Sequence, residues 1–140
     1  MVGLLASSKA YADALSPQRR FAAVVSFYPI CYLAPRGNRG AIEFLRPDHD
    51  RPALVLLAEE DTEAPPSDCL ARLKTLKENG VPVDWHLYAG ATHCWDCSSL
   101  HNFSKVDFLG NRVVYRHDKQ VTTDSIRRTF EYFDARLKAH

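Results

Sequence analysis

The sequence has 140 residues, which fits a single domain and is long enough to bury a core. It is 46% hydrophobic and 25% charged, with a formal net charge of +1 and no basic block, which argues against nucleic-acid or membrane-surface binding. No apolar run approaches the roughly 18 residues that a membrane-spanning helix needs. We therefore expect one globular domain over residues 1–140, without nucleic-acid or membrane partners.

The first part of the chain predicts a helix, a strand and a loop. Residues 2–15 are rich in alanine and leucine and favour a largely buried helix, which Ser16-Pro17 would end. Residues 21–28 form a continuous apolar run, typical of a central parallel strand covered on both faces. Residues 30–50 contain several prolines and glycines and predict a loop, with one helical turn at residues 41–45.

The middle of the chain alternates strand, helix and strand. Residues 53–58 are apolar and predict a second strand, and a helix is expected over residues 66–79. The apolar face of this helix would consist of Cys69, Leu70, Leu73 and Leu76. In residues 81–87, apolar and polar residues alternate, which predicts a third strand with one wetter face.

The last part of the chain predicts an irregular segment followed by a helix. Residues 97–120 are polar apart from a short strand-like run at residues 112–115. The final helix is expected to be capped by Thr122 or Thr123. Its apolar stripe would consist of Ile126, Phe130, Phe133 and Leu137.

This order of elements predicts an α/β fold with a partial parallel sheet of about three strands, flanked by helices. A sheet of three strands with both faces covered leaves a hydrophobic edge exposed. We therefore expect the chain to be part of a larger unit or to pair with another copy of itself.

Asp61 and His93 are the candidate catalytic residues. Asp61 follows the second predicted strand, and His93 follows the third after a turn of small residues. Sites of parallel sheets gather at the carboxyl ends of the strands, where an acid can orient a histidine that acts as a base. The alternatives are that Asp61 is a capping or surface acid and that His93 is bonded to a backbone carbonyl.

The four cysteines, Cys31, Cys69, Cys94 and Cys97, are too few and too scattered for a disulfide framework. They favour free thiols in a reducing compartment such as the cytoplasm, with a Cys94–Cys97 bridge as a minor alternative. A redox dithiol would be expected after a first strand, not after the last. A zinc site formed by His93, Cys94, Cys97 and His101 would need two adjacent ligands to converge, so we expect no metal and no cofactor.

The sequence contains no nucleophile in a G-x-S-x-G turn after a strand. The nearest pattern places Ser8 between alanines two residues away on each side, but Ser8 falls in the first predicted helix. An acid and a base are therefore present without the third member of a triad.

Three segments resemble, in their order and spacing, the last half of the dienelactone hydrolase family. They are residues 21–29, residues 56–61 with Pro65, and residues 88–93. Members of this family are α/β-hydrolases with a Ser or Cys nucleophile, an Asp and a His in that chain order. The resemblance implies that Asp61 is the triad acid and His93 the triad base. It also implies that this chain is the C-terminal half of such an enzyme, with the nucleophile before Met1.

The resemblance implies that the complete enzyme hydrolyses a small-molecule ester or lactone through an acyl-enzyme. Without the nucleophile, we expect this chain alone to be inactive. The alternative function is a non-catalytic module of the same fold, which would form a homodimer through the exposed sheet edge and apolar faces.

Overall fold

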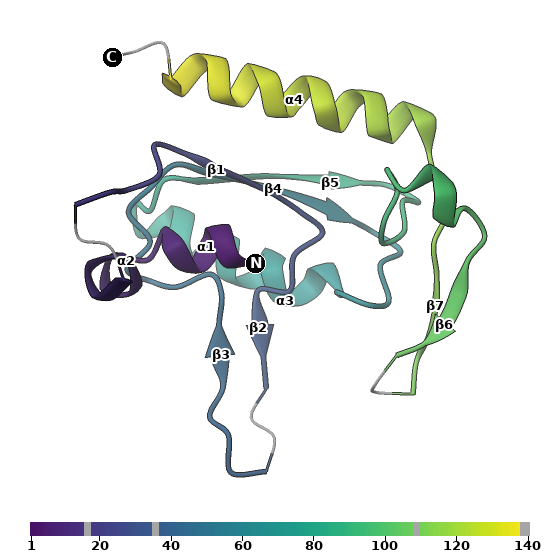
Figure 1. Cartoon of the computed structure of the whole chain (residues 1–140), viewed down its shortest axis with the longest axis horizontal. Coiled ribbons are helices and arrows are strands. Elements are labelled where there is room, and N and C mark those ends of the chain that lie inside the picture. The colour runs from purple at the N-terminus through teal and green to yellow at the C-terminus, as the bar shows by residue number, and fades with distance from the viewer. Residues whose placement is uncertain (16–17, 35–36, 108–109, 138–140) are drawn as a thin grey trace.

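The centre of the structure, a computed structural model that describes residues 1–15, 18–34, 37–107 and 110–137, is a parallel sheet. Its strands are β1 (Val24–Phe27), β4 (Ala53–Ala58) and β5 (Val83–Tyr88), in the order β1-β4-β5. Figure 1 shows α4 (Lys119–Leu137) along one face, and α1 (Val2–Ala6) and α3 (Pro66–Glu78) on the other. The predicted α/β fold, with three parallel strands flanked by helices, is confirmed.

Strand β4 is the central strand and divides the core into two layers. Every residue from Ala53 to Ala58 is buried. Ala53, Val55 and Leu57 pack on the side of α1 and α3, whereas Leu54, Leu56 and Ala58 pack with Tyr132 of α4. A strand that is buried on both faces needs a continuous apolar run, which is why residues 53–58 could be identified as a strand from sequence.

The first apolar run forms an edge strand of this sheet, so its predicted central position was wrong. Strand β1 covers only Val24–Phe27, with buried and half-buried residues in alternation, and within the described ranges it pairs only with β4. Phe21, at the start of the run, lies outside the strand and is 57% exposed. Gly3 lets α1 approach β1 closely, since a Cβ there would lie 3.2 Å from Cγ1 of Val24.

The single buried helix predicted for residues 2–15 is two short helices, α1 (Val2–Ala6) and α2 (Lys9–Leu15). The hydroxyl of Ser8 donates to Oδ2 of Asp48 at 2.7 Å, and this oxygen also accepts from the backbone N–H of Ala10. These bonds start a new helix at this point. Only Leu4 and Ala12 are buried in the two helices, so the prediction of a buried helix was also wrong. The predicted stop at Ser16-Pro17 lies outside the described residues.

Two antiparallel hairpins extend from the sheet (Figure 1). Strands β2 (Tyr32–Leu33) and β3 (Ile42–Glu43) replace the predicted loop with its helical turn at residues 41–45. Strands β6 (Ser104–Val106) and β7 (Arg112–Val114) follow a short 3-10 helix, η1 (Ser98–Leu100). The strand-like run at residues 112–115 is therefore confirmed, and its partner strand was missed.

Helix α3 (Pro66–Glu78) is confirmed with its buried Cys69, Leu73 and Leu76, but α4 differs from prediction. Helix α4 starts at Lys119, because Oδ1 of Asp118 accepts from the N–H groups of Gln120 and Val121 and caps the helix in place of a threonine. No helix in the described ranges is long and apolar enough to cross a membrane.

The apolar stripe of α4 largely faces away from the sheet. Ile126, Phe130 and Leu137 are 47%, 68% and 51% exposed, whereas the buried residues of the helix are Ser125 and Tyr132. The periodicity located the stripe, but the buried face of the helix is the one that carries Ser125 and Tyr132.

The cysteines form two disulfides, Cys31–Cys69 and Cys94–Cys97, so the prediction of free thiols was wrong. Cys31 follows β1 and Cys69 lies on the buried face of α3, and the fold joins them across 38 positions of sequence. The spacing of cysteines in sequence could not show that proximity. Disulfides persist in oxidising compartments, so the bonded pairs remove the reason for favouring a reducing one.

His49 is a histidine that is buried away from the candidate catalytic residues. The residue is only 3% exposed, and neither ring nitrogen has a hydrogen-bond partner within the described structure. Burial lowers the pKa of His49 below its ordinary value of 6.5. Contact with the Arg51 backbone and the charges of Asp50 and Asp48 oppose this shift, and the charge of Arg20 adds to it.

We expect the free energy of unfolding to decrease as the pH falls below 6.5, because the unfolded chain then binds a proton that native His49 resists. Stability from this group is complete above pH 6.5 and is lost towards the lower pKa of the native state. Urea unfolding at several pH values should show that, below pH 6.5, the free energy of unfolding depends less on pH in His49→Leu than in wild type. The half-buried His117 gives the control variant His117→Leu, and an equal pH dependence in all three proteins would contradict this assignment.

Candidate active site

Asp61 is held rigidly where the chain leaves β4. The residue is 4% exposed, and its Oδ1 accepts hydrogen bonds from the backbone N–H groups of Glu63 and Ala64 at 2.9 and 2.8 Å. Because these bonds use Oδ1, the second oxygen is left to face another group. Oδ2 lies 2.8 Å from Nδ1 of His93.

His93 reaches Asp61 because β4 and β5 are neighbours and both end at the same edge of the sheet. The turn after β5 contains Gly90 in the left-handed region, at φ 66°, which favours glycine. The backbone N–H of Glu60 donates to the carbonyl of Ala91, which holds the two loops together. The carboxylate of Asp61 accepts hydrogen bonds and does not donate, so the Nδ1–H of His93 is the donor of this pair. The predicted approach of Asp61 and His93 is therefore present in the structure.

Glu63 is a second carboxylate beside His93. Its Oε2 lies 3.9 Å from Nε2 of His93 and accepts from the hydroxyl of Tyr115 at 2.5 Å, while Oε1 accepts from Nζ of Lys105 at 2.7 Å. Burial alone would raise the pKa of Glu63, but the hydrogen bonds from Lys105 and Tyr115 outweigh it and lower that pKa. Glu63 therefore stays charged and is tied to the β6–β7 hairpin.

Two tyrosine rings contact the imidazole of His93. The ring centroids of Tyr28 and Tyr115 lie 4.4 and 5.6 Å from that of His93. The hydroxyl of Tyr28 donates to Oδ1 of Asp96 at 2.9 Å. Burial, together with the Asp96 carboxylate, raises the pKa of Tyr28 and keeps this hydroxyl protonated as a donor. Tyr28 has a positive φ of 36°, and such strained residues cluster at functional sites.

A nucleophile for His93 is not found in the described part of the chain. No serine, threonine or cysteine there hydrogen-bonds to Nε2 of His93, which faces the carboxylate of Glu63 instead. Ser8 is fully buried and its hydroxyl donates to Asp48. Within the described residues, the structure thus supplies an oriented acid–base pair without a hydroxyl or thiol at the outer nitrogen of the histidine.

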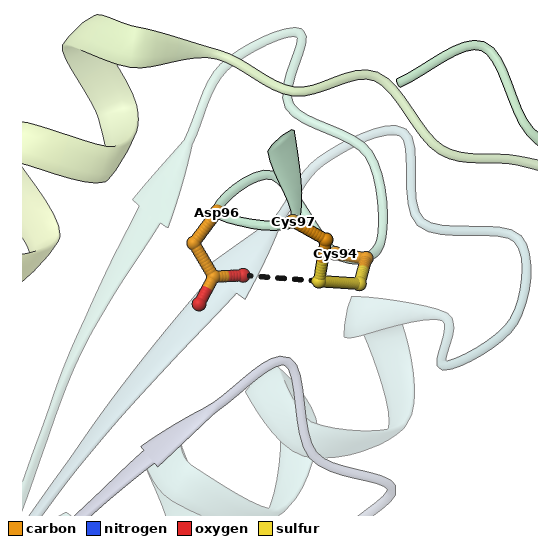
Figure 2. Close-up of side chains that lie close together, drawn as sticks. All are labelled: Cys94, Asp96 and Cys97. Carbon is orange, nitrogen blue, oxygen red and sulfur yellow. Dashed lines mark hydrogen bonds between the residues drawn. A yellow bond between two sulfur atoms is a disulfide. The ribbon is translucent and has the colours of Figure 1, made fainter. Parts of the chain in front are cut away.

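The disulfide after His93 also bears on the metal-binding alternative. Ligand atoms of Cys94, Asp96 and Cys97 lie within 4.8 Å of one another, and Figure 2 shows the carboxylate beside the bonded sulfurs. Both sulfurs are used by the disulfide and cannot act as thiolate ligands in this form. Nδ1 of His101 accepts from the backbone N–H of His117. This structure therefore gives the predicted zinc alternative no support.

A cavity of about 500 Å³ lies beside the site, between the β2–β3 hairpin and the start of α3. Its walls are mostly apolar and include Ile30, Tyr32, Leu33, Ile42, Ala64 and Pro65. Glu63 also lines it, so the cavity and Nε2 of His93 share one side chain as a neighbour. Cavities of this size and character suit small organic molecules.

Sequence reasoning missed Glu63 and Tyr115 as members of this site, whereas Tyr28 could be expected to line a pocket. Tyr28 follows β1 directly, and its position at a strand end was a usable signal. Glu63 stands only two residues after Asp61, yet its direction depends on Lys105 and Tyr115 of a hairpin that was predicted only in part. No local pattern showed that contact.

Comparison with known proteins gives one family and several solved structures. The model of the dienelactone hydrolase family matches residues 9–137. A candidate dienelactone hydrolase from Klebsiella pneumoniae has 16% identity and a TM-score of 0.63, over 91% of this chain and 46% of that one. A carboxylesterase from Lactobacillus plantarum has 14% identity and a TM-score of 0.62, over 95% of this chain and 52% of that one. Esterase 2 of Thermogutta terrifontis, phosphorylated by paraoxon, has 15% identity and a TM-score of 0.57, over 86% of this chain and 44% of that one.

These likenesses show the fold, which is that of α/β-hydrolases. This chain spans about half the length of the solved structures that it matches. Among curated proteins, none matches it.

Proposed function

The chain belongs to the dienelactone hydrolase family, and on this premise we propose that Asp61 and His93 are the acid and the base of an ester- or lactone-hydrolysing triad. The 2.8 Å contact between Oδ2 of Asp61 and Nδ1 of His93 carries this proposal. Asp61 fixes the tautomer and orientation of the imidazole and stabilises the imidazolium that forms during reaction. Nε2 takes the proton of the nucleophile and returns it to the leaving group.

The substrate of the proposed reaction is a small-molecule ester or lactone. The apolar cavity of about 500 Å³ beside Glu63 offers space for an apolar part of such a molecule. The esterases among the structural neighbours are consistent with this class of substrate.

The nucleophile of the reaction is proposed to come from polypeptide outside this chain. Two observations support this: Nε2 of His93 has no hydroxyl or thiol partner in the described residues, and the chain spans about half of its structural neighbours. A histidine alone gives only weak catalysis, so this chain by itself is expected to be inactive.

A second candidate function is a non-catalytic module that forms a homodimer. The exposed stripe of α4, with Ile126, Phe130 and Leu137, favours it. So does β1, which pairs with only one neighbouring strand in the described structure. Unpaired edges and apolar faces of this kind drive association between protein chains.

One experiment separates the two functions. The gene is read upstream of the Met1 codon, and any in-frame extension is expressed beside the 140-residue chain. We expect an in-frame Gly-x-Ser/Cys-x-Gly segment. The extended protein should hydrolyse p-nitrophenyl acetate and form one adduct with paraoxon on that Ser or Cys, whereas the 140-residue chain should do neither. Mass spectrometry locates the adduct.

His93→Ala in the extended protein should lower kcat by roughly four to six orders of magnitude, because the proton transfer loses its base. His101→Ala is the matched control and should leave kcat near that of wild type. Hydrolysis by the 140-residue chain that is lost in both His93→Ala and Asp61→Ala would overturn the proposal of an outside nucleophile. An in-frame stop, together with a dimer in size-exclusion chromatography, would favour the second function.

A further inference from the structure

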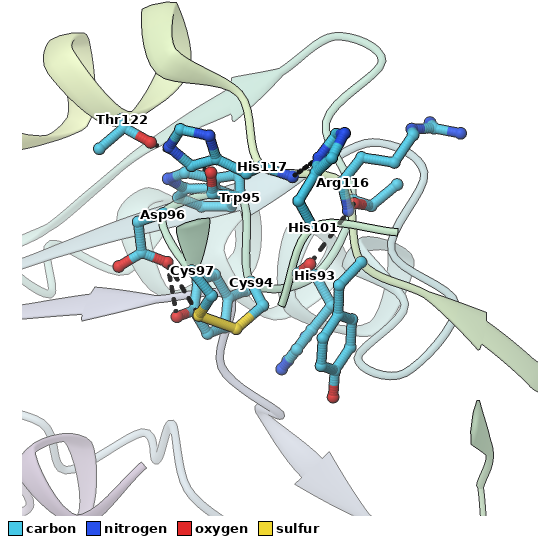
Figure 3. The surroundings of a disulfide bond; sticks show 12 residues. His93, Cys94, Trp95, Asp96, Cys97, His101, Arg116, His117 and Thr122 are labelled. Carbon is cyan, nitrogen blue, oxygen red and sulfur yellow. Dashed lines mark hydrogen bonds between the residues drawn. A yellow bond between two sulfur atoms is a disulfide. The ribbon is translucent and has the colours of Figure 1, made fainter. Parts of the chain in front are cut away.

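The turn directly after His93 adopts a backbone conformation that its sequence does not favour. Cys94 has a φ of 61°, in the left-handed region that residues other than glycine rarely adopt. The disulfide from Cys94 to Cys97 closes this turn into a small ring (Figure 3). A strained residue persists only where its surroundings hold it. The disulfide is one of the restraints that hold Cys94.

Trp95, between the two cysteines, anchors the ring to α4. Its side chain is fully buried and its Nε1–H donates to Oγ of Ser125 at 3.3 Å. Its carbonyl accepts from the hydroxyl of Thr122 at 3.1 Å and from the N–H of Asp118 at 2.8 Å. Trp95 therefore fixes the inner side of the loop. When the disulfide opens, the residues free to move are the two cysteines and Asp96.

Asp96 connects the ring to the far side of His93. Its Oδ1 accepts from the hydroxyl of Tyr28, whose ring lies 4.4 Å from the imidazole. His93 is thus covalently joined to the turn at Cys94 and contacted by Tyr28, which the same loop holds. Asp61 holds His93 from a third direction. A change at the disulfide can therefore reach the imidazole by two routes.

The two disulfides differ in access. Cys31 and Cys69 are each 1% exposed and lie within the core between the sheet and α3. Cys94 and Cys97 are partly exposed at the surface of the loop. A thiol must reach a sulfur atom to exchange with a disulfide. A reductant acting on the folded protein therefore meets Cys94–Cys97 first.

We propose that Cys94–Cys97 is a thiol–disulfide exchange site, and that a dithiol which opens it releases His93 from its fixed position. One thiolate of the dithiol attacks a sulfur of the pair, which forms a mixed disulfide and frees the other cysteine. The second thiol of the reagent then attacks the mixed disulfide. This releases the remaining cysteine and converts the reagent into an oxidised cyclic disulfide. Two electrons pass to the protein, and Cys94 and Cys97 each end as a thiol with one proton.

Opening the ring removes the covalent restraint on Cys94, whose backbone can then leave the left-handed region. The hydrogen bond from Tyr28 to Asp96 and the contact between His93 and Asp61 lose their common support. An effect of this change on catalysis rests on the proposed function. The exchange and the movement of His93 do not, and both can be measured without turnover.

The test uses the folded, oxidised 140-residue chain with dithiothreitol as the dithiol. Samples are alkylated with N-ethylmaleimide under native conditions, digested and analysed by mass spectrometry. Label is expected on Cys94 and Cys97, with the Cys31–Cys69 peptide still joined. The same treatment in denaturant should label all four cysteines, which confirms that both disulfides can be reduced.

His93 is followed in parallel through the low-field proton resonance of its Nδ1–H, which is hydrogen-bonded to Asp61. This resonance should broaden or disappear on reduction. The double variant Cys94→Ser/Cys97→Ser should lack it from the start and should not respond to dithiothreitol. Label on all four cysteines at the same rate, or on none, would overturn the exchange site. Selective label with an unchanged resonance would overturn the link to His93, whatever the hydrolysis assays show.

Discussion

Replacing Asp61 with alanine is expected to lower the free energy of unfolding by about 2–4 kcal/mol, because several donors lose one acceptor group. The carboxylate accepts from the N–H groups of Glu63 and Ala64 and from Nδ1–H of His93. Ala64 and Asp61 are both buried, so water replaces these bonds poorly. Urea unfolding followed by circular dichroism measures the loss.

Asp61→Asn separates stability from chemistry at the same position. The amide oxygen can keep the two backbone hydrogen bonds, so the loss of stability should be smaller than for alanine. The amide nitrogen would face Nδ1 as a donor and favour the wrong tautomer of His93. In an active, extended protein, we therefore expect Asp61→Asn to lose activity by about four orders of magnitude while remaining folded.

The neighbouring acid Glu60 supplies the control. It is exposed and pairs with Arg116 at the surface, where an ion pair contributes about 0–1 kcal/mol. Glu60→Ala should therefore unfold close to wild type. If Asp61→Ala were as stable as Glu60→Ala, its carboxylate would not be what holds the loop.

The parts of the fold that sequence predicted are those where one local pattern had one structural solution. The apolar run from Ala53 to Ala58 was confirmed because its length of six residues between turns suits a strand buried on both faces. The approach of Asp61 and His93 followed from the same pattern, since parallel strands that are neighbours end at one edge.

The parts that sequence missed depend on contacts between distant segments. The hairpin of Tyr32–Leu33 with Ile42–Glu43 has strands too short to show a periodic pattern. The bond between Cys31 and Cys69 needs the fold to bring the start of α3 beside the segment that follows β1. Glu63 joins the site only because Lys105 and Tyr115 of a later hairpin donate to it.

Helix α4 shows how periodicity can mislead about direction. An apolar stripe at helical spacing predicts that one face is covered, but not by what. Tyr132 packs against the sheet instead, and the buried Ser125 accepts a hydrogen bond from the indole of Trp95. The burial of a small polar residue such as Ser125 could not be predicted from the helix sequence, because it depends on a hydrogen bond from the distant Trp95.

Trp95 is the residue on which the core and the candidate site both depend. It is fully buried, and its ring packs against Phe27, Tyr28 and Tyr88 at centroid distances of 5.8, 4.9 and 5.3 Å. We expect Trp95→Ala to lower the free energy of unfolding by about 3–5 kcal/mol, because it leaves a large cavity between the sheet and α4. Urea unfolding by circular dichroism gives the value.

Trp95→Phe should lie between wild type and alanine. Phenylalanine keeps most of the aromatic contact but removes the Nε1–H that donates to Ser125, and a lost hydrogen bond of this kind costs about 1 kcal/mol beyond the reduced packing. Trp85→Ala is the matched control: that tryptophan is only half-buried on β5, so its removal should cost less than that of Trp95. Equal losses for the two alanine variants would contradict a special role for Trp95.

The same variants test how firmly the core positions His93. Trp95 stands two residues after His93 and contacts the Tyr28 ring that covers the imidazole. Loss of the indole should therefore broaden the low-field Nδ1–H resonance of His93 at urea concentrations where the chain is still folded, whereas Trp85→Ala should leave it sharp. A sharp resonance in folded Trp95→Ala would mean that Asp61 alone suffices to orient the imidazole.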